Sequence, residues 1–329
     1  MLSRLHYAQS KALGITSNSI THNLQPSGIV LDTSHNNFVA LDIGSNKFKL
    51  MPSPELNIIL YRGQNNYYEP CLSSVDRKSL SEETRLIDNL KKIEFIELIK
   101  KNPILKNLEE YKILNCTFQN DYEGLAQHYG FLTSHLDLTN SKDIAMFFAT
   151  TRYEKEEYKI IKRKEKGILY KFNYLKEYER INIIGAQGLS RPTKQKGFSL
   201  SLNKNEDFNK LVESYEIIDI TQEKSEYFFN MFEGGAKLMP DDIISKKAKM
   251  ILKKMDISKN SINTYMNTLN LSKYTRKDIV NILNDNKYNI INKDMKFTKK
   301  ELIKISEQWL KKDKQYFIDK VSYRGIYEV

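Results

Sequence analysis

The order of strand-type and helix-type segments is the feature that most limits how this chain can fold. Apolar runs rich in β-branched and aromatic residues, such as residues 56–63 and 167–174, alternate irregularly with stretches of helical periodicity, such as residues 81–113. This order lacks the regular strand, helix, strand repeat of a doubly wound parallel sheet. From about residue 241 onward the periodicity is helical throughout. The order therefore predicts an α+β body with a mixed sheet and a C-terminal helical appendage.

The chain divides into three predicted regions. Residues 1–55 combine a polar arm with a β-hairpin or meander, because residues 28–51 contain apolar runs separated by Gly and Asn turn signals. Residues 56–244 form the α+β body, and residues 245–329 form the helical appendage. A length of 329 residues exceeds that of a typical single domain, so such a division is expected.

The basic residues are concentrated in the appendage. Residues 245–329 hold 20 Lys+Arg and 9 Asp+Glu, whereas residues 1–244 hold 32 of each kind, so the net charge of +11 belongs to the appendage. A long-range positive field attracts nucleic acid or an acidic protein. The simpler interpretation is a solvated helix surface rich in Lys. If the positive charge serves to bind a partner, that partner is expected to be nucleic acid or an acidic protein, bound through residues 245–329.

The cysteines and apolar segments exclude several other classes of protein. Cys71 and Cys116 lack Cys-x-x-Cys spacing, so neither a disulfide framework nor a zinc site is predicted. The first 17 residues contain no apolar core of a signal peptide, and no apolar stretch approaches the roughly 18 residues that a membrane helix needs. We therefore expect a cytoplasmic protein with no membrane partner.

Three segments place polar residues in apolar or turn-forming surroundings. The first is Tyr-Arg-Gly-Gln at residues 61–64, at the end of a predicted strand. An Arg that leaves a strand before a flexible Gly can direct its planar fork into a cleft, where it suits a phosphate or a carboxylate. The alternative is that Arg62 pairs with a surface carboxylate.

The second segment, residues 124–139, holds two His, one Asp, one Gln and several hydroxyl groups. On an alternating strand, His135, Asp137 and Thr139 lie on one face. Such a row can bind a ribose or orient a nucleophile, or it can be an internally satisfied polar row beneath the following helix. Two His and one Asp are too few ligands to predict a metal site.

The third segment is residues 187–198, whose Gly, Pro and Lys residues predict an exposed loop. Gln195 directly precedes a predicted strand, where its amide could bind a hydroxyl group of a ligand. An ordinary hairpin loop is the alternative interpretation.

Together these segments resemble the FRG-domain family, which is named for a Phe/Tyr-Arg-Gly signature. Residues 61–64 look like that signature, and residues 68–77 look like the Pro-Ser-Leu-x-Arg stretch that follows it. Residues 126–133 are similar to the family's Gln-His-Tyr-Gly-x-Pro-Thr, and residues 136–139 to its Leu-Asp-Trp-Thr.

Two later matches complete the resemblance, which extends over roughly residues 56–200. Residues 145–149 are similar to the Ala-x-x-Phe-Ala helix of the family, and residues 191–198 to its Arg-x-x-x-Gln-x-Gly-Phe segment. The departures fall at packing or turn positions: Leu132 stands for Pro, Leu138 for Trp and Cys71 for Ser.

The order of these parts also resembles the Arg-Ser-Glu type of ADP-ribosyltransferase. This analogy implies that Arg62 holds a phosphate or ribose of NAD, that Thr139 takes the hydroxyl position and that Gln195 takes the catalytic-acid position. Cleavage of the nicotinamide glycosidic bond develops positive charge on the ribose, which a carboxylate stabilises. Because Gln195 is uncharged, the carboxylate best placed by the motifs is that of Asp137.

The resemblance therefore implies an ADP-ribosyltransferase-like effector, a toxin or an anti-phage defence component, with NAD as its substrate. The candidate catalytic residues are Asp137, Gln195 and His128. The candidate NAD-binding residues are Arg62, Gly63, Gln64, Tyr129, His135, Thr139 and Arg191.

Two other functions fit the same residues. In a nucleic-acid-binding or RNA-cleaving protein, His128, His135 and Asp137 would act as acid and base, because histidine exchanges protons near neutral pH. In a nucleotide-sensing module without catalysis, the polar residues would be structural. The sequence predicts that Arg62, His128, Asp137, Thr139 and Gln195 converge on one cleft if the chain has a site.

Overall fold

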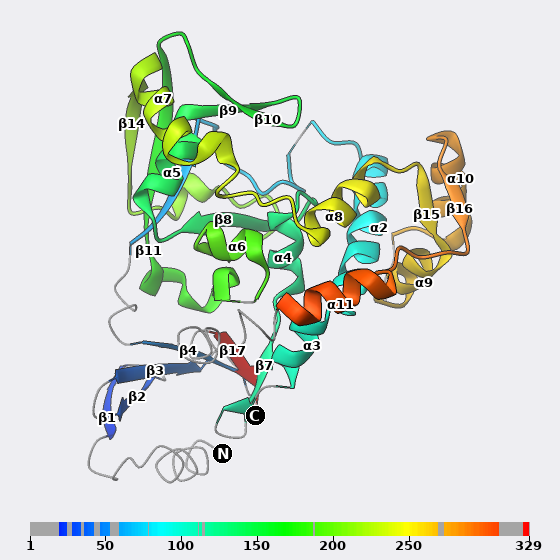
Figure 1. Ribbon diagram of the computed structural model, residues 1–329, viewed down its shortest axis with the longest axis horizontal. Coiled ribbons are helices and arrows are strands. Elements are labelled where there is room, and N and C mark those ends of the chain that lie inside the picture. Colours follow the sequence, from blue (N-terminus) through cyan, green and yellow to red (C-terminus); the bar gives the residue numbers. More distant parts are fainter. Residues whose placement is uncertain are drawn as a thin grey trace.

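The computed structural model describes residues 20–24, 28–33, 36–42, 47–52, 59–77, 79–110, 112–113, 116–186, 188–268, 273–308 and 325–328. A six-stranded sheet and a seven-stranded sheet lie beside a group of helices (Figure 1). The predicted α+β class is confirmed. The first 19 residues of the predicted arm lie outside the described residues.

The six-stranded sheet forms the centre of the body, and each of its neighbouring pairs is antiparallel. Its strands are the apolar runs in which the sequence predicts strands. In spatial order they are β12 (Ile181–Asn182), β13 (Gly197–Ser201), β8 (His135–Thr139), β5 (Ile59–Gln64), β11 (Glu165–Asn173) and β14 (Ser214–Ile220).

The two faces of this sheet bury different apolar groups, because side chains alternate along a strand. One face contributes Leu60, Leu138 and Tyr170 to a large core cluster. The other face carries the helix α5 (Lys142–Thr150), which packs Ala145 and Met146 against Leu169 and Ile218. The sheet is thus covered on both sides, and α5 lies directly on the strands of the site.

Contact between α5 and β5 is very close, and Gly63 makes it possible. A Cβ atom at Gly63 would lie 1.7 Å from the carbonyl oxygen of Ala145. Ser141 is the N-cap of α5, although its side chain makes no capping hydrogen bond.

A β-hairpin follows α5 and projects over the body. Its strands are β9 (Thr151–Glu154) and β10 (Glu157–Ile160), which pair in antiparallel register. Tyr158 of β10 packs against Phe147 of α5, and Phe147 also packs against Phe232, next to the helix α7 (Gln222–Met231). The hairpin is therefore fixed to the body by aromatic packing.

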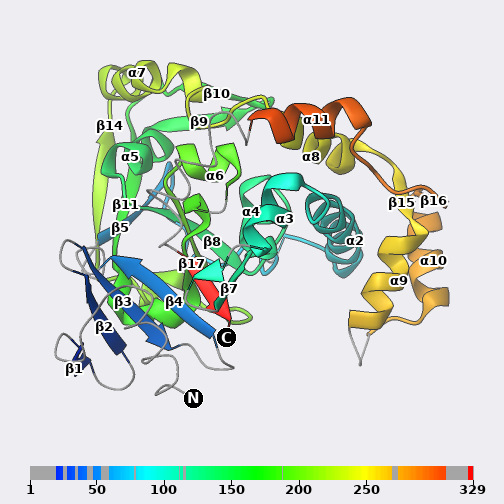
Figure 2. The same ribbon diagram turned by 60° about the horizontal axis from the view of Figure 1, so that its bottom comes forward.

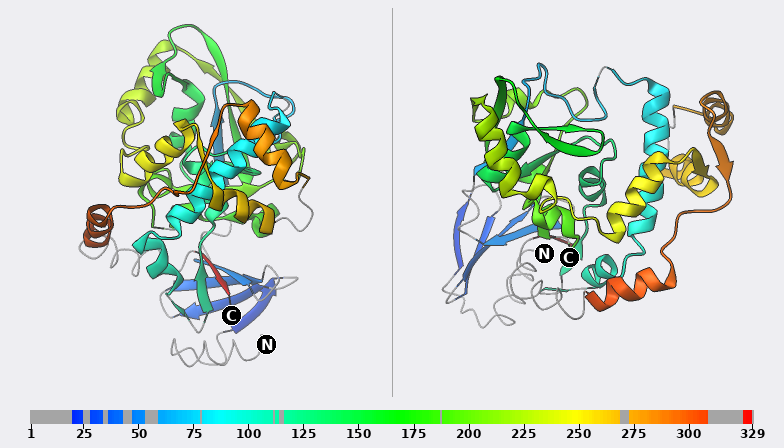
Figure 3. Two further views of the ribbon diagram at one scale, coloured as in Figure 1. Left: turned by 90° about the vertical axis from the view of Figure 1, so that its right-hand side faces the viewer. Right: turned by 45° about the horizontal axis from the view of Figure 1, so that its top comes forward.

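The helices pack around α2 (Glu82–Ile99), which stands between the central sheet and the helices α9 (Lys259–Thr268) and α10 (Arg276–Asp285) (Figure 3). Ser81 begins α2 as a true cap, because its hydroxyl accepts a hydrogen bond from the N–H of Thr84. The remaining helices on α2 and its neighbours are α3 (Pro103–Glu109), α4 (Tyr122–His128), α8 (Ile243–Lys253) and α11 (Lys299–Gln308).

Residues 245–329 are not helical throughout, and that prediction is wrong at three strands. Within this region β15 (Asp256–Ser258) and β16 (Asn289–Ile291) form a parallel pair, and β17 (Gly325–Glu328) joins the seven-stranded sheet. Strands of three or four residues are too short to show alternation in the sequence. The helical periodicity of their neighbours therefore hides them.

The seven-stranded sheet joins the two ends of the described chain. Figure 2 shows β17, in red, beside the blue strand β4. The predicted hairpin or meander of residues 28–51 is confirmed as three consecutive antiparallel strands. The sheet order is β1 (Ile20–Leu24), β2 (Gly28–Thr33), β3 (Asn36–Asp42), β4 (Lys47–Pro52), β17, β7 (Cys116–Gln119) and β6 (Lys112–Ile113).

Short helical turns complete the described chain. The segment predicted as an exposed loop contains the helix α6 (Ser190–Lys194), in which Pro192 lies in the first turn, where proline is tolerated. The 3₁₀ turns are η3 (Tyr174–Arg180), η4 (Ile184–Ala186), η5 (Phe208–Lys210) and η6 (Glu233–Gly235). Over the residues described above, no helix has the length and apolar character needed to cross a membrane.

Candidate functional site

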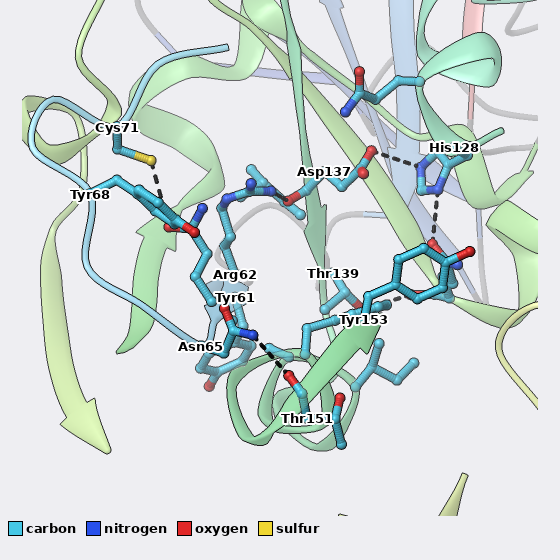
Figure 4. A pocket seen from close by; sticks show the side chains of 18 of the residues that line it. Tyr61, Arg62, Asn65, Tyr68, Cys71, His128, Asp137, Thr139, Thr151 and Tyr153 are labelled. Atoms are coloured by element: carbon cyan, nitrogen blue, oxygen red, sulfur yellow. Dashed lines mark hydrogen bonds and ion pairs between the residues drawn. The ribbon is translucent and has the colours of Figure 1, made fainter. Parts of the chain in front are cut away.

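The central sheet opens between β5 and β8, and this opening forms the candidate site. The two strands pair at Tyr61 and Thr139. Beyond that pair, the Nη1 atom of Arg62 donates a hydrogen bond of 2.8 Å to the carbonyl oxygen of Asp137. A cavity of about 630 Å³ lies at this point, between the two strands, the hairpin and α6 (Figure 4).

Most of the candidate residues converge on this cavity. The five residues that were expected to share one cleft all line this cavity: Arg62, His128, Asp137, Thr139 and Gln195. The other predicted site residues in the cavity lining are Gly63, Gln64 and Arg191. They come from four segments that are far apart in the sequence. The structure places Tyr129 and His135 outside the cavity lining.

Three arginines face the cavity without a carboxylate partner. Arg62, Arg77 and Arg191 make no ion pair with any described residue, and the Nε atoms of Arg62 and Arg191 are buried without a hydrogen-bond acceptor among them. A buried guanidinium nitrogen without an acceptor is costly, so Arg62 and Arg191 favour an anionic ligand, whereas Arg77 is exposed to solvent. The guanidinium carbon of Arg191 lies 5.7 Å from the ring centre of Tyr129, which thus supports Arg191 from outside the cavity.

A chain of polar contacts runs along one wall of the cavity. The Nε2 atom of His128 lies 3.5 Å from Oδ1 of Asp137, and its Nδ1 atom lies 2.9 Å from Oε1 of Gln195 (Figure 4). The Nε2 atom of Gln195 donates to the carbonyl oxygen of Leu238 at 3.2 Å. His128 and Gln195 are buried, whereas the Asp137 side chain is 38% exposed. Of this chain, Asp137 is therefore the group most open to a ligand.

The hydroxyl of Thr139 is already engaged. It donates to the backbone carbonyl of Gln195 at 2.8 Å and accepts from the N–H of Ser141 at 3.2 Å. Thr139 thus joins the end of β8 to α6 and to the start of α5. This geometry assigns it a structural contact in addition to its place in the cavity lining.

Two tyrosines stand on opposite sides of the cavity, Tyr68 and Tyr153 (Figure 4). Tyr68 is 48% exposed and Tyr153 is 55% exposed, so each offers open ring surface. Tyr158 lies 4.9 Å from Tyr153 between ring centres, and burial raises the pKa of its phenol above the usual value. Tyr158 therefore stays neutral and can only donate or accept a hydrogen bond.

Sequence reasoning missed Tyr153, Tyr158, Phe148 and Met239 as lining residues. Tyr153 and Tyr158 flank the turn at Lys155 and Glu156, where both residues have positive φ. The available signal was a Tyr on each side of a charged turn, which is typical of a hairpin. That signal gives no indication that the hairpin folds over the cavity.

His135 belongs to a second group of polar residues, which we name the Lys49 cluster: Lys49, Asp121, His135 and Ser199. The Nδ1 atom of His135 hydrogen-bonds to the Ser199 hydroxyl and lies 3.9 Å from Oδ2 of Asp121. Lys49 reaches from β4 and donates to the carbonyl oxygen of Tyr178. Burial lowers the pKa of Lys49 to about 7. The polar row predicted on β8 is thus divided between the cavity and this cluster.

No group of three His, Cys, Asp or Glu side chains in the described part of the chain is arranged to hold a metal ion. The cavity contains one thiol, that of Cys71, whose Sγ lies 3.6 Å from Oε1 of Gln64. The cavity lining thus combines guanidinium, carboxylate, imidazole, amide, phenol, hydroxyl and thiol groups.

Comparison with known proteins gives a family model that matches part of the chain. A family model of the FRG domain matches residues 57–158, which include β5, α4, β8, α5, β9 and the first half of β10. No curated protein and no solved structure gives a significant match to the chain. Arg191 and Gln195 lie beyond the matched residues but complete the same cavity. The chain therefore carries an FRG domain at residues 57–158.

Proposed function

We propose that the cavity binds NAD as a substrate and breaks its nicotinamide glycosidic bond, as an ADP-ribosyltransferase does. The observation that carries this proposal is the joint presence, in one cavity, of unpaired arginines and the Asp137 carboxylate. The volume of the cavity, about 630 Å³, lies within the range of roughly 300–1,000 Å³ that is usual for small-molecule sites.

The diphosphate of NAD would bind to the arginines. Nη1 of Arg62 is held by the carbonyl of Asp137, so the orientation of the guanidinium is fixed and its other N–H groups are left for a ligand. Arg191 is held over the ring of Tyr129. A planar guanidinium binds two phosphate oxygens at once, which suits a diphosphate better than an ammonium group does.

The planar groups of NAD would stack on the tyrosines. Tyr68 and Tyr153 present open rings on opposite sides of the cavity, and Tyr61 and Phe148 add further aromatic surface to the lining. Stacking of a base on an aromatic side chain contributes about 1–3 kcal/mol. The cavity thus offers surfaces for both the adenine and the nicotinamide.

Asp137 is the group that would promote bond cleavage. When the bond between C1′ and the nicotinamide nitrogen breaks, its electron pair leaves with nicotinamide and positive charge develops on the ribose. A fixed carboxylate stabilises that charge. Oδ1 of Asp137 is buried against His128, so the exposed part of the side chain is the part that can face the ribose.

The test is release of nicotinamide from NAD by the full chain, measured chromatographically with and without a cell extract as acceptor. Asp137→Asn should lower release by about 100-fold or more, because it removes the charge, and should still bind NAD. Asp143→Asn is the matched control, since Asp143 is exposed on α5 and outside the cavity lining. Absence of both NAD binding and nicotinamide release in the unaltered chain would refute the proposal, as would full activity of Asp137→Asn.

An effector role follows from this chemistry. An enzyme that depletes NAD or inactivates an essential macromolecule harms the cell that contains it, and such an activity would suit a toxin or an anti-phage defence component. Expression of the unaltered chain in bacteria should arrest growth, and expression of Asp137→Asn should not. Equal growth of the two cultures would argue against this role.

RNA cleavage is the second candidate, and the His128–Asp137 pair favours it. Acid–base cleavage of a phosphodiester needs two proton-transfer groups at one phosphate. The second histidine of that hypothesis, His135, is hydrogen-bonded to Ser199 in the Lys49 cluster and does not line the cavity. Cleavage of RNA by the chain in the absence of NAD would support this candidate.

NAD binding without turnover would instead indicate a sensing module.

The appendage would supply the partner contact. Lys299, Lys300 and Lys304 of α11 are exposed and make no ion pair with a described residue. Replacing all three with Glu should weaken binding to nucleic acid, and the affinity of the unaltered chain should fall steeply as salt concentration rises. An affinity that does not change with salt would exclude a nucleic-acid partner at this surface.

A further inference from the structure

We propose that Gln195 is a positioning residue, which fixes the proton of His128 on Nδ1 and so makes the His128–Asp137 pair a proton acceptor. The catalytic consequence rests on the function proposed above, whereas the position of the proton does not. The argument starts from the orientation of the Gln195 amide.

The contacts of Gln195 determine which way its amide points. The carbonyl oxygen of Leu238 can only accept a hydrogen bond, so the atom 3.2 Å from it must be the amide nitrogen. The amide oxygen of Gln195 therefore faces His128, at 2.9 Å from Nδ1. Because that oxygen is an acceptor, Nδ1 must carry the proton of the neutral imidazole.

This assignment leaves a lone pair on Nε2 of His128. The Nε2 atom lies 3.5 Å from Oδ1 of Asp137, and neither of these two atoms has a hydrogen-bond partner among the described residues. An ionised carboxylate is also only an acceptor. Two buried acceptors thus face each other, and one additional proton between them would satisfy both.

The position of the His128 ring is built into the fold. A Cβ atom at Gly197 would lie 2.7 Å from Cε1 and 2.8 Å from Nε2 of His128, so only glycine leaves room for the ring over β13. The backbone of Gln195 is held by Thr139 through a hydrogen bond of 2.8 Å. The charged and titratable groups around the pair in the cavity are Arg62, Arg191 and Tyr158.

The pair can take up the proton that the transfer reaction releases. As the bond from C1′ to nicotinamide breaks, the oxygen of a hydroxyl acceptor or of water forms a bond to C1′ and loses its proton. That proton enters at the exposed side of Asp137 and comes to lie between Oδ1 of Asp137 and Nε2 of His128. The products are neutral nicotinamide, the ADP-ribosylated acceptor and a protonated pair. Where water attacks C1′, the product is ADP-ribose in place of the ADP-ribosylated acceptor.

Nitrogen NMR of the imidazoles in the full chain locates the proton directly. We expect a protonated Nδ1 and an unprotonated Nε2 in His128, with the signals assigned by their loss in His128→Asn. In Gln195→Leu the acceptor at Nδ1 is gone, so the proton should move to Nε2, where it can bind Asp137. Gln195→Glu restores an acceptor oxygen and should return the proton to Nδ1.

Kinetics then separate positioning from folding. Gln195→Leu should lower turnover by about 100-fold, because the lone pair on Nε2 is lost, with KM for NAD changed less than about twofold. Gln195→Glu should recover at least about a tenth of the turnover of the unaltered chain. Gln222→Leu, at an exposed position of α7, should change neither the spectrum nor the turnover.

The spectrum decides the proposal even if NAD is not the substrate. A proton on Nε2 in the unaltered chain, or an unchanged spectrum in Gln195→Leu, would overturn the assignment. A spectrum as expected together with no NAD turnover would preserve the assignment and refute the proposed function. Turnover that is the same in Gln195→Leu would refute the catalytic role of the pair.

Discussion

Tyr153 occupies an unusual position for an aromatic residue. Its ring packs against Tyr158 at 4.9 Å, yet 55% of the residue remains exposed at the cavity. An aromatic ring fixed on one side and open on the other is suited to stacking. Its environment thus indicates a contact with a planar part of the ligand.

Replacing Tyr153 with Leu should weaken NAD binding roughly 5- to 150-fold, because a base stacked on an aromatic ring contributes about 1–3 kcal/mol. Titration calorimetry measures the change. Tyr227→Leu is the control, since Tyr227 is 61% exposed on α7 and does not line the cavity. Equal dissociation constants for the two variants would show that Tyr153 makes no stacking contact.

Individual residues of the site differ in how well the sequence predicts them. Arg62, His128 and Asp137 are polar residues within apolar segments, and that contrast identifies them without a structure. The role of Gln195 as a hydrogen-bond partner of His128 was not predictable, because 67 residues separate them. Nor was the position of Tyr153, which depends on where the hairpin lies. Contacts distant in sequence leave no local pattern.

At the scale of elements, the site depends on how closely α5 approaches β5. Gly63 allows this approach, since any Cβ atom at this position would overlap the backbone of Ala145. Backbone atoms cannot move aside as a flexible side chain can. The orientation of Arg62, the preceding residue, therefore depends on a glycine that contributes no functional group.

Gly63→Ala should lower the free energy of unfolding by about 1–3 kcal/mol or more, as overpacking against a fixed backbone does. Gly130→Ala is an informative contrast. Gly130 has a φ of +94°, but its Cβ would meet only Leu252, at 3.7 Å. We expect Gly130→Ala to lower the free energy of unfolding by about 1 kcal/mol, from backbone strain alone. Denaturant titration compares the two, and equal losses would show that the α5–β5 contact tolerates a methyl group.

The elements that the sequence predicts correctly are the long ones. The strands of the body and the helix α2 have enough residues to show their period. The helix α6 was not predicted, because its five residues include Pro192 and follow a Gly-containing turn. The strands β15 and β16 have three residues each and form a parallel pair with each other. Short elements are determined by tertiary contacts, which a local pattern does not contain.

At the scale of the whole molecule, part of the positive charge of residues 245–329 is used internally. Lys254 lies 2.7 Å from the buried carboxylate of Glu94 on α2, and Lys247 lies 3.0 Å from Glu301 on α11. The Lys254–Glu94 pair joins the appendage to α2, and the Lys247–Glu301 pair joins two helices within the appendage. The net charge alone therefore overstates what is available to a partner, and the exposed lysines of α11 are the better measure.

The Lys49 cluster joins the seven-stranded sheet to the body and should make stability depend on pH. Burial lowers the pKa of Lys49 from 10.5 to about 7 in the folded chain. Between these values the unfolded chain binds a proton that the folded chain does not, so Lys49 makes stability rise with pH. Lys49→Met removes this contribution.

We therefore expect the free energy of unfolding of Lys49→Met to change less between about pH 7 and about pH 10 than that of the unaltered chain. Denaturant titrations at the two pH values measure this change. Lys166→Met is the control, because the Lys166 side chain is 72% exposed. An equal pH dependence in Lys49→Met and the unaltered chain would contradict the burial of Lys49.

The central claim is that the cavity at the opening of β5 and β8 binds a diphosphate ligand through Arg62. Titration calorimetry of the full chain with NAD tests it most directly. We predict saturable binding that Arg62→Ala weakens by about 10- to 150-fold, from the loss of roughly 1.5–3 kcal/mol of charge-assisted hydrogen bonding. Arg163→Ala, at an exposed position outside the cavity, should bind like the unaltered chain. No binding by the unaltered chain, or equal affinity in Arg62→Ala, would contradict the account.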